Sequence, residues 1–246
     1  MESLQAEYTE VWAASPNLPL ARFADGARAI ASTGLDLLEF GTNLNLIGQL
    51  IGFDSIISWY GANRPEFREC VKDLPFQFFT AIPPINCTMH AADFFTAQVG
   101  ASVPAIPRVD CSSGGCPRGD GGFAVIHPFS GSPKKCWPLD RYQELARLIE
   151  PHMPVRWCAG PEERLPDAVR IADLYELACW LAMARFYVGN DSGITHLAAA
   201  VGTPVVALFG PTDPRIWAPR GPQVRVIAKP TLEDITADEV LAAALC

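Results

Sequence analysis

The segment YVGNDSGITHLAAAVGTPVVALFGPTDP (187–214) brings several reactive side chains to the point where an apolar run meets an Ala-rich helix: Asp191, Ser192, Gly193 and His196. The start of a helix presents unpaired N–H groups and a partial positive charge, which stabilise an anion by up to about 2 kcal/mol in partly buried geometry. The alternative is simple N-capping by Asp191 or Ser192, which contributes about 1 kcal/mol. One cap accounts for only one of these two residues. The segment therefore favours an anion site beside a carboxylate, although a lone histidine such as His196 is often a core residue.

A second segment, FAVIHPFSGSPKKCWPLDRY (123–142), also runs from an apolar strand through a loop into a helix. Its loop carries small and cationic residues, which are Ser130, Gly131, Ser132, Lys134 and Lys135. A lysine about 4 Å from a phosphate gains about 4 kcal/mol at an effective dielectric constant near 20. The loop suits an oxygen-rich anion. The alternative is an ordinary turn with two solvated lysines.

Two further loops follow apolar strands in the same half of the chain. WCAGPEERLP contains Glu162 and Glu163, and LFGPTDP contains Gly210 and Thr212. Each loop alone is compatible with a solvated charge pair or a plain turn. Because ligands of parallel α/β sheets bind beyond the carboxyl ends of the strands, we expect all four loops to converge. Such a pocket offers N–H groups and lysine to phosphates, and carboxylates and hydroxyls to a polyol, and so suits a nucleotide diphosphate joined to a sugar.

Strand-like runs alternate with helical patterns along the whole chain, which predicts an α/β fold with largely parallel sheets. In the N-terminal half we expect strands over 8–14, 34–40 and 53–60, and helices over 19–31, 42–51, 65–71 and 91–101. In the C-terminal half we expect strands over 122–128, 153–160, 185–190, 204–210 and 223–228, and helices over 138–150, 174–184, 192–201 and from 236. Pro, Gly and Ser dominate the region between the halves. We therefore expect an N-terminal domain (1–110), a linker (111–121) and a C-terminal domain (122–246).

Composition excludes several classes of protein. The net charge is −8 and lysines and arginines do not cluster, so nucleic acid is not an expected partner. No secretory signal or membrane span is recognisable, and eight scattered cysteines without a C-x-x-C pair are typical of free thiols in the cytoplasm. Cys111 and Cys116 flank SSGG, which leaves open a small disulfide loop or a contribution to a metal site. No metal or cofactor is expected.

These segments resemble glycosyltransferase family 9, the heptosyltransferase-type enzymes of the GT-B fold. VGNDSGITHLAAAVGTPVVALFGPTDP is similar to the family signature nearly end to end, and HPFSGSPKKCWPLDRYQELA is similar to the segment that opens its second domain. The resemblance is specific over 122–217. It implies two Rossmann-like domains that face a cleft, with an ADP-sugar donor, typically ADP-heptose, in the C-terminal half and a lipopolysaccharide-core-type acceptor in the N-terminal half. It also implies inversion at the anomeric centre, no metal, and peripheral contact with the inner membrane through the acceptor.

The resemblance also implies roles for individual residues. Lys135 matches the family lysine that contacts the donor phosphates, and Asp191 matches the carboxylate that bonds to sugar hydroxyls; we expect these two to be catalytic. The residues Ser192, Gly193 and His196 match family residues that line the donor diphosphate. Glu163, or alternatively Glu162, falls near a family acidic residue that faces the nucleotide-sugar. The remaining loop residues, Ser130, Gly131, Ser132, Gly210 and Thr212, are expected to bind substrate.

Family members begin with a strand and a Gly-rich turn whose Asp is taken as the general base. In the family this turn is followed by a helix, and the first residues of this sequence, MESLQAEY, resemble the end of that helix. We therefore expect an N-terminal domain without that strand and loop. Asp25 is expected within a helix, and no base is assigned. Two alternatives follow: a donor-binding but inactive remnant, or a GT-B enzyme that uses another nucleotide-sugar, as a transferase or an epimerase. The segment 55–67 is a candidate for acceptor contact, with core packing as its alternative.

Overall fold

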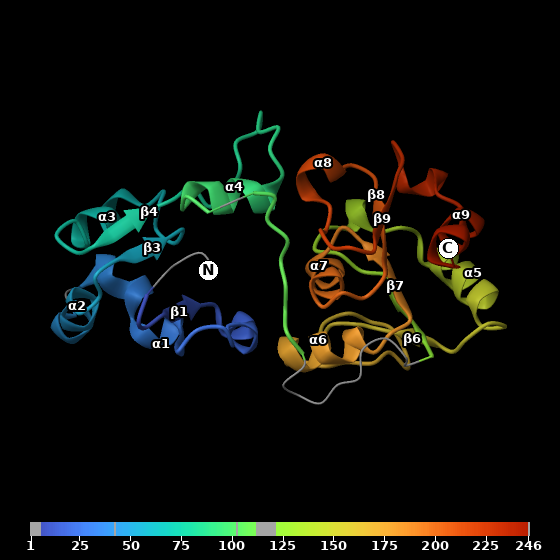
Figure 1. Cartoon of the computed structure of the whole chain (residues 1–246), viewed down its shortest axis with the longest axis horizontal. Coiled ribbons are helices and arrows are strands. Elements are labelled where there is room, and N and C mark those ends of the chain that lie inside the picture. The colour runs from blue at the N-terminus through green and yellow to red at the C-terminus, as the bar shows by residue number, and fades with distance from the viewer. Residues whose placement is uncertain (1–5, 42, 102, 112–121, 246) are drawn as a thin grey trace. The chain divides into compact units, whose positions relative to one another are not determined.

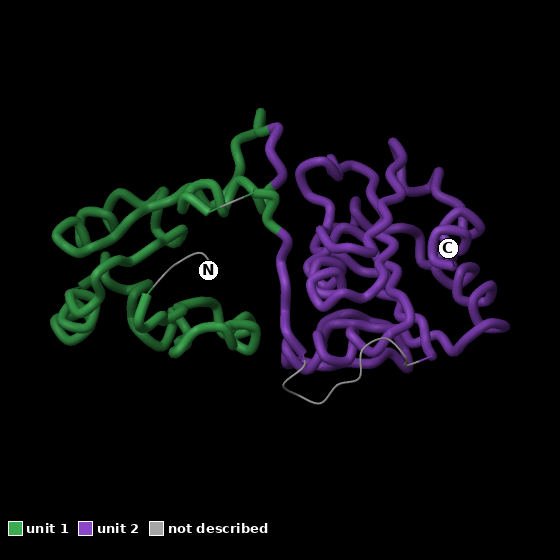
Figure 2. Tube along the Cα trace, in the orientation of Figure 1, with its two compact units in different colours: residues 1–87, 91–105 green, residues 88–90, 106–246 purple. Residues whose placement is uncertain are grey.

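The structure, a computed structural model, describes residues 6–41, 43–101, 103–111 and 122–245. The chain forms two compact units, coloured separately in Figure 2. Unit 1 consists of residues 1–87 and 91–105, and unit 2 consists of residues 88–90 and 106–246. In the described residues, no helix is both long enough and apolar enough to cross a membrane.

The boundary between the units lies before residue 110, where the sequence was expected to divide. Residues 106–111 belong to unit 2, because the N–H of Val109 donates to the carbonyl of Ala200 at 3.0 Å and Tyr175 donates to the carbonyl of Asp110 at 3.2 Å. Most of the expected linker (111–121) lies outside the described residues. Its one described residue, Cys111, is buried in unit 2.

Unit 2 contains one five-stranded, fully parallel sheet in the order β6-β5-β7-β8-β9. Its strands are β5 (Ala124–His127), β6 (Val155–Trp157), β7 (Phe186–Asn190), β8 (Val205–Phe209) and β9 (Val224–Ala228). Its helices are η4 (Pro133–Lys135), α5 (Leu139–Ile149), α6 (Leu174–Ala182), α7 (Gly193–Ala200), α8 (Pro214–Trp217), η5 (Leu232–Asp234) and α9 (Ala237–Leu245). The strands and helices expected in this half are confirmed, with boundaries that differ by a few residues.

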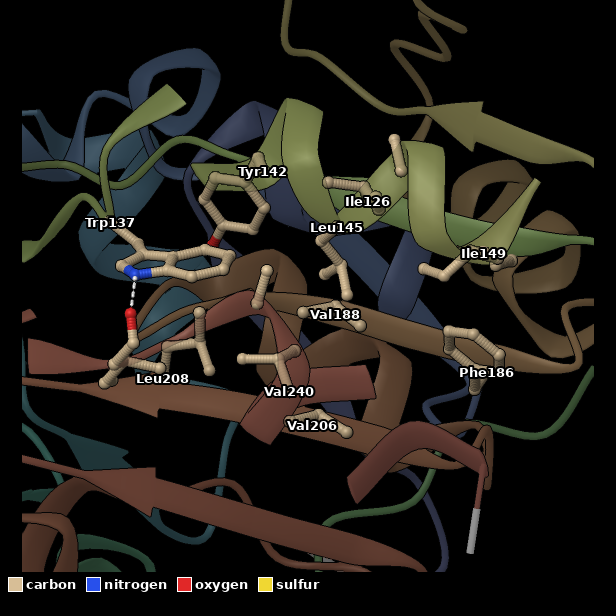
Figure 3. Close-up of a cluster of buried hydrophobic side chains, with 14 of the residues drawn as sticks. Ile126, Trp137, Tyr142, Leu145, Ile149, Phe186, Val188, Val206, Leu208 and Val240 are labelled. Carbon is tan, nitrogen blue, oxygen red and sulfur yellow. Dashed lines mark hydrogen bonds between the residues drawn. The ribbon is translucent and has the colours of Figure 1, made fainter. Parts of the chain in front are cut away.

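Helices cover both faces of this sheet, with α5 and α9 on one face and α6 and α7 on the other (Figure 1). Strands covered on both faces lose all contact with water, and every residue of β7 and β8 is buried. Helix α5 places an apolar stripe against the sheet, and Figure 3 shows Leu145 of this stripe pointing toward Val188, with the Tyr142 ring beside Trp137. This layered core fixes the ends of the strands that carry the candidate site.

The strand order creates a topological switch point between β5 and β7. From β5 the chain crosses to β6 on one side of it, and then returns to β7 on the other side. The connections that leave β5 and β7 therefore lead to helices on opposite faces of the sheet, α5 and α7. At such a point the two loops diverge and leave a crevice at the carboxyl edge, which is where α/β proteins bind ligands.

Unit 1 contains two separate parallel pairs, β1-β2 and β3-β4. Its elements are β1 (Glu10–Ala13), η1 (Ser15–Leu20), β2 (Gly26–Ala29), α1 (Ile30–Thr33), η2 (Leu35–Phe40), α2 (Leu44–Ile51), β3 (Ile56–Ser58), α3 (Pro65–Cys70), β4 (Phe76–Phe78) and α4 (Ala91–Gln98). Its core joins buried side chains from η2, α2 and α3. The parallel α/β character expected of this half is confirmed.

Several element predictions for unit 1 are wrong. The helix expected over 19–31 is replaced by η1 and β2, since Pro16 and Pro19 oppose a regular α-helix. The strand expected over 34–40 is the 3₁₀ helix η2, whose buried Leu35 and Leu38 follow helical rather than alternating spacing. Strand β4 was not predicted.

Asp25 also differs from its expected position within a helix. It lies in the turn before β2, where its carboxylate accepts a hydrogen bond from the N–H of Thr9 at 2.8 Å. The two residues connect the starts of β1 and β2, which are paired strands. Asp25 therefore has a structural role in this turn, and no general base is assigned to it.

Candidate functional site

The loop after β5 is joined to the loop after β7 by two hydrogen bonds. The ammonium Nζ of Lys135 lies 2.7 Å from Oδ2 of Asp191, and the hydroxyl of Ser130 donates to the Asp191 carbonyl at 2.7 Å. Lys135 ends η4, and Asp191 directly follows β7. The two residues expected to be catalytic therefore meet at the switch point between β5 and β7.

Asp191 also connects the loop after β8 to this cluster. The hydroxyl of Thr212 donates to Oδ2 of Asp191 at 2.9 Å, so one carboxylate oxygen receives both Thr212 and Lys135. The Asp191 side chain is 9% exposed, whereas the Lys135 side chain is 33% exposed. The carboxylate is thus fixed in a low-dielectric position, while the ammonium remains open to an incoming anion.

Ser192 is the N-cap of α7, and Asp191 is not. The Ser192 hydroxyl accepts a hydrogen bond from the N–H of Thr195, as capping requires. The first N–H groups of a helix have no partner within it, so those of Gly193 and Ile194 remain available. A methyl group placed on Gly193 would meet no atom within 4 Å. The helix start therefore faces open space beside Lys135 and Asp191.

His196 lies half-buried in the first turns of α7. Burial lowers the pKa of His196, and the nearby negative charge of Asp191 opposes this shift without cancelling it. The imidazole is therefore neutral at pH 7. It carries no positive charge, and a hydrogen bond to the Trp217 backbone uses one of its nitrogens.

Of the two glutamates in the loop after β6, only Glu163 is tied to the neighbouring strand. Its Oε2 accepts hydrogen bonds from the N–H of Gly160 at 2.6 Å and from Nε2 of His127 at 3.1 Å. Partial burial acts to raise the pKa of Glu163, but these hydrogen bonds outweigh it and hold the pKa below its usual range. Glu162 is exposed. The geometry therefore favours Glu163 over Glu162 as the acidic residue of the site.

The expected glycines and serines of the loops differ in surroundings. Gly131 is exposed, with no atom near the position of a methyl group, and the carbonyl of Ser132 accepts the N–H of Lys135 at 3.0 Å. Gly210 is different, because a methyl group there would lie 2.8 Å from Cγ of Leu232. The close approach that Gly210 permits is therefore made by Leu232 of η5, and Gly210 serves packing.

Sequence reasoning did not identify the buried polar residues that hold these loops. Asn190 is fully buried at the end of β7, and its Oδ1 accepts the N–H of Trp137 and the hydroxyl of Tyr142, both at 2.9 Å. These bonds anchor the segment that follows Lys135 to β7. His127, at the end of β5, is a second such residue. A polar residue inside an otherwise apolar strand was the available signal for both.

A second support lies beneath the start of α7. The hydroxyl of Tyr187 lies 3.1 Å from Oγ1 of Thr195, and both residues are fully buried. The Tyr187 ring lies where a side chain on Gly189 would stand. Gly189 is therefore needed for Tyr187 to reach α7.

The described residues contain no cluster of three His, Cys, Asp or Glu side chains that could hold a metal ion. Cys136 and Cys158 are free thiols in the loops of the site, and burial raises the pKa of Cys158 to about 12. Cys158 is therefore protonated and unreactive at pH 7. The suggested pairing of Cys111 with Cys116 cannot be described, because Cys116 lies outside the described residues.

In unit 1, the segment 55–67 contributes to both core and surface. Trp59 packs against Phe79 and Phe95, with ring centroids 5.9 and 6.5 Å apart, as the core-packing alternative expects. Beside this segment is a hollow of about 540 Å³, lined by Ala62, Asn63, Pro65, Arg68 and Glu69. Aromatic residues of the segment thus serve packing, and its later residues line a polar hollow.

Residues 110–240, just over half of the chain, match the model of glycosyltransferase family 9 (heptosyltransferase). The chain is 30% identical over 139 residues to lipopolysaccharide heptosyltransferase 1 of Escherichia coli O18:K1:H7 (strain RS218 / NMEC), covering 50% of this chain and 43% of that protein. It is 33% identical over 113 residues to lipooligosaccharide heptosyltransferase 2 of Haemophilus influenzae, covering 39% of this chain and 33% of that protein. These matches span less than half of the relatives' length.

The fold is that of solved heptosyltransferases. The structure of E. coli ADP-heptose lps heptosyltransferase II superposes with a TM-score of 0.72 and 19% sequence identity, over 96% of this chain and 89% of that chain. At this identity the superposition is evidence for the fold alone, and the fold agrees with the expected α/β architecture. Together with the match over residues 110–240, it leads to one conclusion: the chain belongs to glycosyltransferase family 9, the heptosyltransferase family.

Proposed function

We propose that the chain binds an ADP-sugar, with heptose as the sugar, at the carboxyl edge of the unit 2 sheet and transfers the sugar with inversion to a lipopolysaccharide-core-type acceptor. One observation carries the proposal: Lys135, Asp191 and Thr212 come from three loops and meet beside the open start of α7. An ammonium and free N–H groups suit a diphosphate, and a fixed carboxylate suits sugar hydroxyls. The relatives' names, which include heptosyltransferases 1 and 2, support the choice of heptose.

The donor diphosphate would lie between Lys135 and the N–H groups of Gly193 and Ile194. The helix start and the ammonium both favour negative charge, and both are fixed before the donor arrives. To reach the phosphate, Lys135 lengthens its bond to Asp191 or shares its three N–H donors between the two anions. The sugar then lies next to Asp191, whose carboxylate accepts its hydroxyl groups.

The reaction is a single displacement at the anomeric carbon. The acceptor oxygen forms a bond to this carbon while the bond to the β-phosphate oxygen breaks, and ADP leaves with the bonding electrons. Charge develops on the leaving diphosphate, where Lys135 and the start of α7 would stabilise it more strongly in the transition state than in the donor. The acceptor hydroxyl loses its proton to a general base.

The acceptor would bind to unit 1, for which the hollow beside the segment 55–67 is the candidate. It offers Asn63, Arg68 and Glu69, which can hydrogen-bond to the hydroxyl and acidic groups of a glycan. Peripheral contact with the inner membrane would follow from the lipid end of such an acceptor. No metal takes part in the proposed reaction.

The test compares Lys135→Ala with Lys134→Ala. Lys134 is the exposed neighbour of Lys135, so both variants lose one positive charge from the same loop. We expect Lys135→Ala to weaken ADP binding at least tenfold by calorimetry and to lower transfer from ADP-heptose by 100-fold or more, with Lys134→Ala close to the unchanged chain. Because Lys135→Ala also leaves Asp191 without its cation, unfolding is measured in parallel and Lys135→Gln is included.

Unaltered binding and transfer in Lys135→Ala would contradict the proposal. ADP binding without transfer to any heptose-deficient core acceptor would favour a donor-binding, inactive protein. Tighter binding of UDP-sugars than of ADP-sugars in a donor panel would favour a different nucleotide-sugar.

A further inference from the structure

His127 and Glu163 form a pair that spans two neighbouring loops of the sheet edge. His127 ends β5 and is 3% exposed, whereas Glu163 follows β6 and keeps 27% of its side chain exposed. A single hydrogen bond of 3.1 Å joins Nε2 of His127 to Oε2 of Glu163. The pair therefore links a buried group in the strand to a carboxylate at the surface of the site.

The imidazole of His127 makes this contact with Nε2, and its other nitrogen, Nδ1, makes none with the part of the chain that the structure describes. Among the described residues, Nδ1 is buried and has no hydrogen-bond partner. Since a carboxylate only accepts hydrogen bonds, Nε2 carries the proton, and the lone pair of Nδ1 is buried without a donor. An apolar side chain would avoid this burial of an unpaired polar atom. The Nε2 bond to Glu163 is what distinguishes the histidine from such a side chain.

Glu163 is held by one oxygen and presents the other. Its Oε2 receives both His127 and the N–H of Gly160, so the plane of the carboxylate is fixed by two donors. Neither bond uses Oε1, which leaves that oxygen to accept a hydrogen bond from a ligand. The same two bonds keep the carboxyl group ionised, because they lower its pKa.

The pair lies on the opposite side of the β5 loop from Asp191. Strand β5 stands between β6 and β7 in the sheet, so its loop is joined to Glu163 on one side and to Asp191 on the other. Strand β5 and the loop that follows it therefore contact both carboxylates, Glu163 through His127 and Asp191 through Lys135.

We propose that His127 is a positioning residue for donor binding: it holds Glu163 so that Oε1 accepts a hydrogen bond from a hydroxyl group of the nucleotide-sugar. The inference rests on the proposed function. The hydroxyl belongs either to the ribose or to the transferred sugar, and Glu163 makes the site selective for a donor that carries it.

The test measures dissociation constants for ADP, 2′-deoxy-ADP and ADP-heptose. Glu163→Gln is compared with Glu162→Gln, which removes the same charge from the exposed neighbour. His127→Phe, which keeps a ring and removes the donor, is compared with His127→Gln, whose amide N–H can still reach Glu163. We expect His127→Phe and Glu163→Gln each to weaken donor binding about tenfold, and Glu162→Gln and His127→Gln to stay within about threefold of the unchanged chain.

The double variant separates positioning from general loss of structure. If His127 acts through Glu163, His127→Phe has less than a twofold effect when Glu163→Gln is already present. If Glu163 binds a ribose hydroxyl, the unchanged chain should prefer ADP over 2′-deoxy-ADP, and His127→Phe and Glu163→Gln should each lose this preference. If Glu163 binds a hydroxyl of the transferred sugar, both variants should instead lose affinity for ADP-heptose and not for ADP.

Equal effects of His127→Phe with and without Glu163 would overturn the inference, as would a Glu163→Gln variant that binds all three ligands like Glu162→Gln. If His127→Phe does not fold, the comparison of Glu163→Gln with Glu162→Gln and the recovery in His127→Gln decide the matter. Absence of ADP and ADP-heptose binding by the unchanged chain would contradict the proposed function itself, and this inference with it. Binding by the unchanged chain that does not depend on Glu163 contradicts the inference alone.

Discussion

Lys135 and Asp191 form an ion pair, with Nζ 2.7 Å from Oδ2. The two charges that we assign to different parts of the donor are thus paired with each other. The diphosphate must compete with Asp191 for Lys135. Loss of the Asp191 charge should therefore affect the nucleotide and the sugar in opposite ways.

Asp191→Asn is expected to leave ADP binding unchanged or up to tenfold tighter, since Lys135 is released to the phosphates. The additional affinity of ADP-heptose over ADP should disappear and transfer should fall about 100-fold, since the amide is a weaker acceptor for sugar hydroxyls. Calorimetry with both ligands and a transfer assay check this. Asp140→Asn, an exposed change of equal charge, is the control. ADP binding that weakens in parallel with ADP-heptose binding would contradict the assignment.

Gly193→Ala should separate binding from stability. A methyl group at Gly193 meets no atom within 4 Å, so the free energy of unfolding is expected to stay within about 1 kcal/mol of the unchanged chain. The same methyl group fills the space in front of α7, where the phosphates are proposed to lie. ADP binding should weaken at least tenfold. Gly48→Ala, an equally open helical glycine in unit 1, should alter neither property; normal ADP binding by Gly193→Ala would exclude the helix start as the phosphate site.

Asn190→Ala tests the anchor of the Lys135 segment. The change leaves the N–H of Trp137 and the hydroxyl of Tyr142 buried without their shared acceptor. Because each unsatisfied buried group costs about 1–3 kcal/mol, denaturant unfolding should show a loss of about 2–6 kcal/mol. Tyr142→Phe removes one donor and keeps the acceptor, and should cost less. Equal stability of Asn190→Ala and the unchanged chain would show that the anchor contributes nothing.

Gly189→Ala should destabilise the protein by about 1–3 kcal/mol, because its methyl group overlaps the buried Tyr187 ring. Thermal and denaturant unfolding measure this cost. Gly131→Ala is the matched control, since that site is exposed and open. Combining Gly189→Ala with Tyr187→Leu should recover part of the loss, whereas additive losses would place the strain elsewhere.

The pKa of His196 is lowered from 6.5 in the folded protein by burial, the largest cause. Below pH 6.5 the unfolded chain therefore binds a proton that the folded protein resists, and the free energy of unfolding falls as the pH decreases through this window. Above pH 6.5 both states are neutral at this residue and no penalty exists. His196→Gln should remove this part of the pH dependence. His152→Gln, an exposed change, should retain it, and an identical pH profile for both variants would contradict the lowered pKa.

Local sequence patterns predicted the strands and main helices of unit 2 and many of the elements of unit 1. In unit 2 the strands β7 and β8 are five-residue apolar runs covered on both faces, and α5 carries a clear apolar stripe. In unit 1 the strands β1 and β3 and the helices α2, α3 and α4 lie where they were expected, whereas β2 and η2 were assigned wrongly and β4 was missed. The two central residues of β2 are exposed, so β2 carries no apolar run, and its pairing with β1 decides its conformation.

The sequence alone determined which side chains follow the strands, because the change from apolar run to polar loop is local: Lys135, the pair Glu162 and Glu163, Asp191 and Thr212 were all found in this way. It could not determine which of them touch. Lys135 and Asp191 are 56 residues apart, and Asp191 and Thr212 are 21 apart. Their contacts depend on the strand order β6-β5-β7-β8, which is set by packing across the whole sheet.

The tertiary structure also decided the roles of buried polar residues. The types of His127 and Asn190 were visible within apolar strands, but their partners Glu163, Trp137 and Tyr142 come from other loops and helices. Most buried polar atoms have a hydrogen-bond partner in the folded state, and that partner is chosen by three-dimensional proximity. The chain's sequence thus determined its chemical groups and their strand ends, and only the assembled sheet determined which groups act together.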